Sequence, residues 1–247
     1  MKLRALKTLV AAASLMAAGA SHSMIVDFEG VIDTTFAGFF PLLGHNDEIV
    51  NKGFYIDALS NAATPNNGDL VGAILNGSEL ADSCAGITCP SNNATTFLAG
   101  LNDGLFVIGS ADNALFRFAG FDASFIGAQG ATLPAVPGLV RLQGIKADNT
   151  SLTQTFNLGG PSSTGALSFK SFATTGAFST TLFQNVYFFG FACNVGGSCT
   201  AFSSNAAQFA IDNINVTAVP EPSTWALMMG GLVAAAAFRR RSAKANS

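Results

Sequence analysis

Apolar positions between residues 24 and 218 recur in short runs, without the period of a long helix. Apolar residues alternate with polar ones over 139–143, in Phe209 and Ile211, and again in Ile214 and Val216. A period of two is that of a half-buried strand, and clusters of Gly, Asn, Ser and Pro separate the runs as turns do. The predicted strands are 24–29, 53–59, 105–108, 114–118, 123–126, 139–145, 152–156, 168–173, 184–191 and 208–217.

Many short strands at such spacing predict an all-β fold, an antiparallel β-sandwich of jelly-roll-like type. Residues 24–218 are long enough for one hydrophobic core and are predicted to form one exported domain. Residues 60–100 are the least regular part, predicted as a long excursion with one short helix. An N-terminal signal helix and a C-terminal transmembrane helix are expected to flank the domain.

The N-terminus has the pattern of a secretory signal peptide over residues 1–23. A basic segment ending at Lys7 precedes an apolar stretch over 8–20. Ala18 and Ala20 supply the small residues that signal peptidase requires, which predicts cleavage within 20–23. Export through the inner membrane is therefore expected.

The C-terminal segment, 219–247, combines a Pro-rich motif, an apolar run of 14 residues and a basic end. As a helix the run would reach about 21 Å, short of a hydrocarbon core of roughly 30 Å, so interfacial side chains are needed to complete the span. The arginines predict a cytoplasmic end. The residues concerned are Pro220, Glu221, Pro222, Trp225, Phe238, Arg239, Arg240 and Arg241.

This arrangement resembles the PEP-CTERM sorting signal of Gram-negative bacteria. The resemblance implies processing of the tail by an exosortase and delivery of the body to the cell surface or extracellular matrix. It also implies a link to exopolysaccharide and biofilm formation. Gln208, Phe209 and Asp212 are similar to a Gln-Phe-x-x-Asp signature found upstream of the signal in one group of such proteins.

Charge is distributed unevenly along the chain. The ends carry most of the basic residues, whereas 24–219 hold five basic and fourteen acidic residues, a net charge of −9. A phosphate backbone is bound by clustered Lys and Arg, so the composition argues against nucleic acid as a partner.

The four cysteines form two local pairs in sequence, Cys84 with Cys89 and Cys193 with Cys199. An even number in an exported chain predicts disulfides, and of the three connectivities the local one is favoured. A zinc site is the alternative, although it would favour closer spacing or histidines.

Catalytic chemistry has little support in the body of the chain. His45 is its only histidine, in a loop-like stretch without a nucleophile elbow or metalloprotease motif. A pair of glycosidase carboxylates is compatible with fourteen acids, but none stands in a recognisable setting. The prediction is a non-enzymatic protein without a required cofactor.

A structural calcium ion is one candidate ligand. Asp27 and Glu29 lie on one face of the first predicted strand, and Asp212 and Asn213 lie on the last. First and last strands of jelly rolls are often adjacent, which would bring these oxygen ligands together. The alternative is that the four are solvated or turn-forming residues.

Carbohydrate is the other candidate. Sugar sites commonly use Trp and Tyr, yet the body has no Trp, two Tyr (Tyr55 and Tyr187) and 21 Phe, mostly at alternating positions that favour the core. The favoured interpretation is therefore an exported structural or adhesive protein. The alternatives are a carbohydrate-binding module or weak glycan-active enzyme, and a simple membrane-anchored periplasmic protein.

Overall fold

The computed structural model describes residues 23–31, 41–219 and 231. The described body, Ser23–Ala218, forms one compact unit. Its strands are β1 Ser23–Val26, β2 Leu42–Gly44, β3 Glu48–Asn51, β4 Phe54–Leu59, β5 Leu70–Asn76, β6 Ile87–Thr88, β7 Thr96–Gly100, β8 Leu105–Ser110, β9 Phe116–Phe125, β10 Gly127–Ala128, β11 Gly138–Ile145, β12 Ser151–Leu158, β13 Lys170–Ala173, β14 Asn185–Cys193, β15 Cys199–Thr200 and β16 Phe209–Ala218. Three short helices accompany them: η1 Gly77–Glu79, α2 Leu80–Ser83 and α3 Gly176–Thr180.

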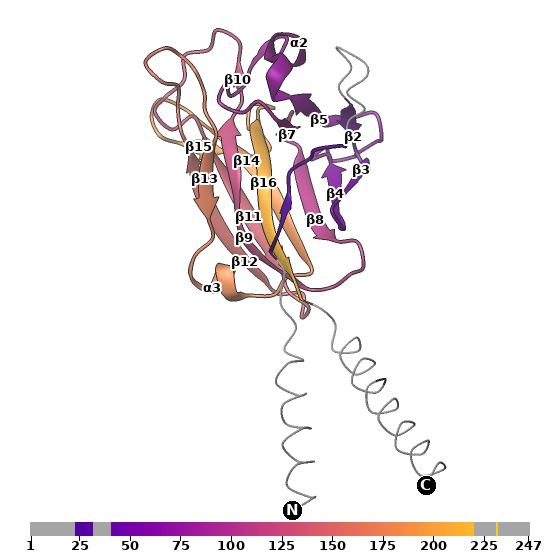
Figure 1. Cartoon of the computed structure of the whole chain (residues 1–247). Coiled ribbons are helices and arrows are strands. Elements are labelled where there is room, and N and C mark those ends of the chain that lie inside the picture. The colour runs from indigo at the N-terminus through magenta and orange to yellow at the C-terminus, as the bar shows by residue number, and fades with distance from the viewer. Residues whose placement is uncertain (1–22, 32–40, 220–230, 232–247) are drawn as a thin grey trace, which may run out of the picture. The chain divides into compact units, whose positions relative to one another are not determined.

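The strands form two antiparallel sheets of seven strands each (Figure 1). The first sheet has the order β13-β9-β16-β7-β5-β2, with β1 also paired to β16. The second sheet has the order β12-β11-β14-β8-β4-β3, with β15 paired to β14, and β10 and β6 form a separate small ladder. The prediction of an antiparallel β-sandwich is confirmed, and the narrower jelly-roll assignment stays a prediction.

Alternating burial decides which side chains enter the core. The eight residues of β11 alternate buried and half-buried from end to end, as do the six of β4. Successive side chains of a strand point to opposite faces, so each sheet supplies one apolar layer to the space between the sheets. The largest fully buried side chains include nine phenylalanines: Phe28, Phe54, Phe97, Phe106, Phe116, Phe118, Phe183, Phe188 and Phe209.

Phenylalanine pairs join the two sheets across the core. Phe188 of the second sheet lies edge-to-face with Phe118 at 5.5 Å and with Phe121 at 5.7 Å between ring centroids, both from the first sheet. Phe106 and Phe209 make a similar contact at 6.2 Å. Such geometry adds about 0.5–1.5 kcal/mol per pair beyond the area buried.

A second, smaller core covers the outer face of the first sheet. Leu75 of β5 and Phe97 of β7 belong to it, together with partly buried residues of α2 and of the Cys84–Cys89 loop. Phe97 packs edge-to-face on Phe169 with centroids 5.3 Å apart. In Figure 1, α2 lies at one end of the sandwich and α3 at the end where β16 finishes.

The irregular region 60–100 holds more structure than the sequence pattern predicts. It contains η1 and α2, consistent with the expected short helix, but also β5 and β7. These two strands are buried on both faces, so their apolar and small residues do not alternate with polar ones. The predicted strands 114–118 and 123–126 are one continuous strand, β9, because the residues between them pair with β13.

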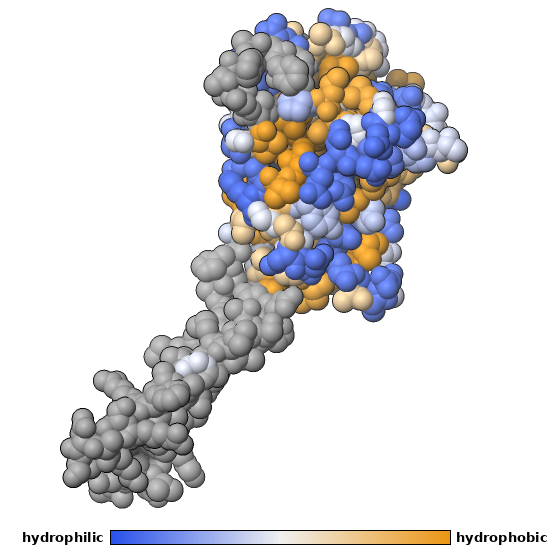
Figure 2. All heavy atoms as spheres, turned by 90° about the vertical axis from the view of Figure 1, so that its right-hand side faces the viewer, coloured by the Kyte–Doolittle hydropathy of each residue, from blue (hydrophilic) through white to orange (hydrophobic). Residues whose placement is uncertain are grey.

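Apolar side chains remain exposed at the sheet edges. Leu42 of β2 is 63% exposed and Val50 of β3 is 58% exposed. Figure 2, which shows the side of the sandwich that is on the right in Figure 1, has apolar groups there interrupted by polar ones. The edge strands β2 and β3 are only three and four residues long, which limits pairing with other chains.

The predicted segments at the two ends fall largely outside the described residues. Within the described part, no helix has the length and apolarity that crossing a membrane requires. The apolar run from Trp225 to Phe238 lies outside that part apart from Gly231, as does the signal peptide apart from Ser23. Ser23, the last residue of the predicted signal peptide, is the first residue of β1.

The packing predicts that Gly144→Ala is destabilising. A methyl group on Gly144 would come within 2.3 Å of the ring of Phe183, which is fully buried and cannot move away freely. We expect the free energy of unfolding to fall by about 1–3 kcal/mol in urea titrations. Gly196→Ala is the control, since its nearest contact is the flexible side chain of Asn194 at 3.3 Å. Equal stability of the two variants would contradict this packing.

Candidate functional site

Strands β7 and β1 follow one another along the same side of β16. Residues Phe209–Ile211 of β16 pair with β7, and Ile214 onward pairs with β1. Asp212 and Asn213 lie between the two ladders, at a position we call the terminal-strand junction. The sequence predicts that the first and last strands are adjacent, and the pairing of β1 with β16 confirms this prediction.

Asp212 has no exposed surface at this junction. Its Oδ2 accepts hydrogen bonds from Asn93 Nδ2 at 2.8 Å and from Thr95 Oγ1 at 3.2 Å, both in the segment before β7. Its Oδ1 accepts the backbone N–H of Asn213 at 2.7 Å. The carboxylate therefore connects the start of β7 to β16 where the backbone ladder is interrupted.

Asn213, the second residue of the junction, contacts the neighbouring strand β9. It adopts a positive φ of 49°, and the register with β9 shifts between Asp212 and Asn215. Its Nδ2 donates to Asp122 Oδ2 at 2.9 Å, and Asp122 lies opposite Asp212 in the ladder. The amide thus separates two carboxylates that would otherwise face each other directly.

Burial controls the ionisation of Asp212. Loss of hydration raises the pKa of this carboxyl from 3.8 to about 6, and the nearby Asp122 carboxylate acts in the same direction. Hydrogen bonds from Asn93, Asn213 and Thr95 oppose the rise in pKa without cancelling it. At neutral pH the ionised Asp212 carboxylate therefore lowers the stability of the fold, and its hydrogen-bond donors offset part of this loss.

The other two predicted calcium ligands have partners of their own. Asp27 forms an ion pair with Lys52, and Glu29 Oε1 accepts the backbone N–H of Thr96 at 2.7 Å. Within residues 23–31, 41–219 and 231, no three His, Cys, Asp or Glu side chains are grouped to hold a metal ion. Calcium binding at Asp27, Glu29, Asp212 and Asn213 stays a prediction.

His45 is held as part of a loop. Its Nδ1 accepts the backbone N–H of Ser60 at 3.0 Å, which uses the ring nitrogen lone pair to fix the chain after β4. The backbone N–H of His45 donates to the carbonyl of Asp69 at 3.1 Å. This histidine therefore joins two neighbouring loops.

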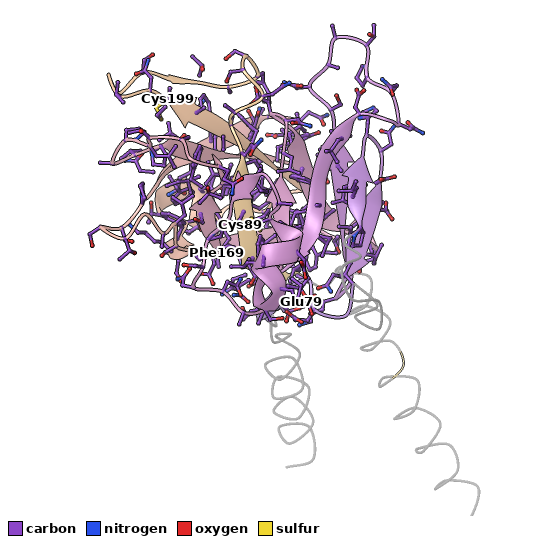
Figure 3. The ribbon with its side chains drawn as sticks, turned by 90° about the horizontal axis from the view of Figure 1, so that it is seen from above. Glu79, Cys89, Phe169 and Cys199 are labelled. Carbon is purple, nitrogen blue, oxygen red and sulfur yellow. A yellow bond between two sulfur atoms is a disulfide. The ribbon has the colours of Figure 1, made fainter. Side chains whose placement is uncertain are left out.

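Both predicted disulfides are present with the local pairing, Cys84 with Cys89 and Cys193 with Cys199. Figure 3 shows Cys89 beside Phe169 and Cys199 well apart from them. The described residues contain no free cysteine. The zinc alternative is thereby set aside for all four cysteines.

A hollow of about 490 Å³ lies close to the second disulfide. Its lining includes Ile126, Leu133, Pro137 and Gln208, and the remaining lining residues are also apolar or uncharged. Without a titratable side chain, its wall offers shape and apolar contact and no acid or base of its own.

Two sets of hydrogen bonds within the fold could not be predicted from the sequence. Asn93 and Thr95 look like turn residues in a polar stretch, and only the fold brings them to Asp212. Asp103, 1% exposed, accepts three backbone N–H groups from 204–207, the nearest at 2.7 Å from Ala207. The sequence offers no signal for such contacts, because more than a hundred residues separate the partners.

The family description "PEP-CTERM protein-sorting motif" matches residues 218–241. The match includes the Pro-Glu-Pro motif, the apolar run and the three arginines, so the predicted sorting motif is confirmed. Its presence implies an exported, envelope-directed protein that is processed by an exosortase. The Gln-Phe-x-x-Asp subgroup stays a prediction. A search of curated proteins finds no match.

Several solved structures are similar to the chain at low identity. TmCBM61 in complex with beta-1,4-galactotriose has 6% identity and a TM-score of 0.33, covering 71% of this chain and 92% of its own. A cyclase from Fischerella sp. TAU has 11% identity and a TM-score of 0.41, covering 81% and 98%. A family 16 carbohydrate-binding module has 14% identity and a TM-score of 0.27, covering 59% and 84%. At these TM-scores the similarities carry no argument about ligand or activity.

The raised pKa of Asp212 predicts a pH-dependent stability. Between about pH 4 and pH 6 the folded chain holds a proton on Asp212 that the unfolded chain releases, so stability declines as pH rises through this range. Asp212→Asn abolishes this decline. We therefore expect the unfolding free energy of the wild type, minus that of Asp212→Asn, to fall from pH 4 to 6 and to level off above.

Asp148→Asn is the control for this titration. Hydrogen bonds from Thr150 lower the pKa of Asp148 below 3.8, so its contribution is present above that pH and lost below it. The unfolding free energy of the wild type, minus that of Asp148→Asn, should therefore rise as pH rises, and should do so at lower pH than the change for Asp212. Parallel curves for wild type and Asp212→Asn between pH 4 and 6 would show that Asp212 titrates normally.

Calorimetric titration with Ca²⁺ tests the predicted metal site. If calcium binds at the terminal-strand junction, Asp212→Ala should lose the binding heat, and so should Asp27→Asn, directly after the neighbouring strand β1. The second variant matters because Asp212 is buried and its removal also affects folding. Unchanged calcium affinity in both variants, or no binding by the wild type, would refute the site.

Proposed function

We infer that the chain is an exported surface or extracellular-matrix protein of a Gram-negative bacterium, with a non-enzymatic structural or adhesive role. The observation that carries this proposal is the sorting motif, which matches from residue 218 onward, where β16 ends. Because the motif comes directly after the last strand, cleavage there would leave the disulfide-stabilised domain whole. The link to exopolysaccharide and biofilm is part of the proposal.

The strand pairing supports processing at both ends. Ser23, at the predicted signal-peptidase site, lies opposite Thr217 in the ladder, and its Oγ donates to Asn215 Oδ1 at 2.6 Å. Both membrane-directed segments therefore leave the domain from neighbouring strand ends. Only Val219 separates β16 from Pro220. From the sequence alone, prolines on both sides of Glu221 disfavour helix and sheet, which would suit recognition of the motif by a processing enzyme.

A non-enzymatic role is supported by how the reactive side chains are used. His45 fixes a loop, Asp212 joins strands, and Asp103 holds the segment before β16. Each of these groups already has hydrogen-bond partners within the fold. We therefore assign the domain a role in contact with other surface material.

Intact mass spectrometry of the protein recovered from its native envelope and medium tests the proposal. Loss of both ends should leave roughly residues 21–220. Replacing Pro220, Glu221 and Pro222 by alanine should preserve the tail, whereas Ser223→Ala with Thr224→Ala is the matched control and should be processed normally. A wild-type species that retains Trp225 to Ser247 would instead indicate a plain membrane anchor.

A further inference from the structure

The two sheets differ in how their outer faces are covered. Residues of α2, the Cys84–Cys89 loop and Phe169 pack over the first sheet. In the described residues, neither hydrophobic core cluster extends over the outer face of the second sheet, and the outward side chains on β4, β11 and β14 are half-buried. This open face is rich in aromatic and hydrogen-bonding side chains.

Strand register places these side chains in two adjacent rows across the sheet. One row contains Glu48, Asp57, Val107, Tyr187, Gln143 and Thr153. The next contains Val50, Tyr55, Gly109, Asn185, Ile145 and Ser151. Both tyrosines of the chain therefore lie on this one face, on either side of β8.

Tyr55 is fixed in place by its neighbours. Its hydroxyl donates to Asn185 Oδ1 at 2.7 Å, so the side chain crosses β8 to reach β14. It can do so because Gly109 lies beneath, where a Cβ would come within 2.3 Å of the hydroxyl oxygen. A rigid aromatic ring held by a buried glycine is preorganised for contact with a ligand.

Two carboxyl groups border the tyrosines. Glu48 and Asp57 are directly opposite in the ladder, and burial, then Glu48, raise the pKa of Asp57. Like charges in such positions are unfavourable. The ion pairs of the described residues are Lys52 with Asp27 and Lys146 with Asp148, and neither supplies a cation to this pair. A positively charged ligand would relieve the repulsion.

The other end of the same face is already occupied by the protein itself. The Arg141 guanidinium lies 4.7 Å from the ring centroid of Phe191, and Phe202 stacks on Phe189 at 5.4 Å. The accessible part is therefore the tyrosine end, bounded by Glu48 on one side and Gln143 on the other. We call it the tyrosine platform.

We propose that the tyrosine platform binds a polysaccharide that carries unacetylated amino sugars. The C–H faces of sugar rings suit Tyr55 and Tyr187, the amides of Gln143 and Asn185 suit hydroxyl groups, and the carboxyl pair suits an ammonium group. From β3 to β11 the platform spans about 19 Å, at ~4.8 Å between strands, which exceeds one sugar ring. This inference rests on the proposed function, because export brings the domain to envelope polysaccharides.

Two ligands that differ only in acetylation test the proposal. Isothermal titration uses the full chain in detergent, with the hexamer of glucosamine and the hexamer of N-acetylglucosamine, at a pH where the amines are charged. We expect the glucosamine hexamer to bind at least about tenfold more tightly, with an affinity that falls as salt is added. Equal affinity for the two hexamers would overturn the assignment to amino sugars.

Variants locate the binding on the platform. Tyr187→Ala should weaken binding at least about fivefold, and Glu48→Gln should reduce the preference for the unacetylated hexamer by roughly threefold or more. Glu48 is exposed on an edge strand, so its substitution leaves the fold intact. Glu79→Gln is the matched control, an exposed glutamate of η1 away from the second sheet (Figure 3).

The outcomes separate this inference from the proposed function. Binding that is lost equally in Glu79→Gln would indicate only nonspecific attraction to an acidic protein, and would overturn the site. Binding of neither hexamer by the full chain would also overturn it, and would leave the sorting proposal intact if the native protein has lost both ends. Platform-dependent binding by the full chain, together with native protein that retains its tail in the mass measurement, would support the site and refute the sorting.

Discussion

The fold depends on how β16 is paired along its whole length. One side is bound by β9, and the other side is shared by β7 and β1, which meet end to end at Asp212 and Asn213. Where two strands meet, the backbone ladder has a gap. The side chains of Asn93, Thr95 and Asp212 supply the missing hydrogen bonds. A buried carboxylate is tolerated here because its hydrogen bonds join the segment before β7 to β16.

This junction also explains the arrangement of the chain ends. Because β1 pairs with the final residues of β16, the predicted signal peptide and the sorting motif leave from neighbouring positions. The pairing of β1 with β16 spans nearly the whole sequence, and contacts between such distant residues form slowly.

The two outer faces of the sandwich differ in how they are covered. The outer face of the first sheet is closed by a short helix and a disulfide loop, which bury Leu75 and Phe97. The outer face of the second sheet displays Tyr55 and Tyr187 beside paired carboxyl groups. An acidic domain with one closed and one open face is suited to contact with cationic material on the open side.

The sequence by itself determined the sorting signal, the class of fold and the disulfide pairing. These features are local: they depend on motif spacing, on a period of two, and on cysteines five or six residues apart. The step of three between Ile211 and Ile214 even marks the irregularity in β16. Strands β5 and β7 were missed because burial on both faces removes the alternation that identifies a strand.

Only the tertiary structure decided which distant side chains meet. The contacts of Asp212 with Asn93, and of Tyr55 with Asn185, join residues more than a hundred positions apart. Strand order sets these contacts, and strand order follows from the packing of the whole domain, which no short stretch of sequence encodes. For the same reason the tyrosine platform could be recognised only once the register of the second sheet was known.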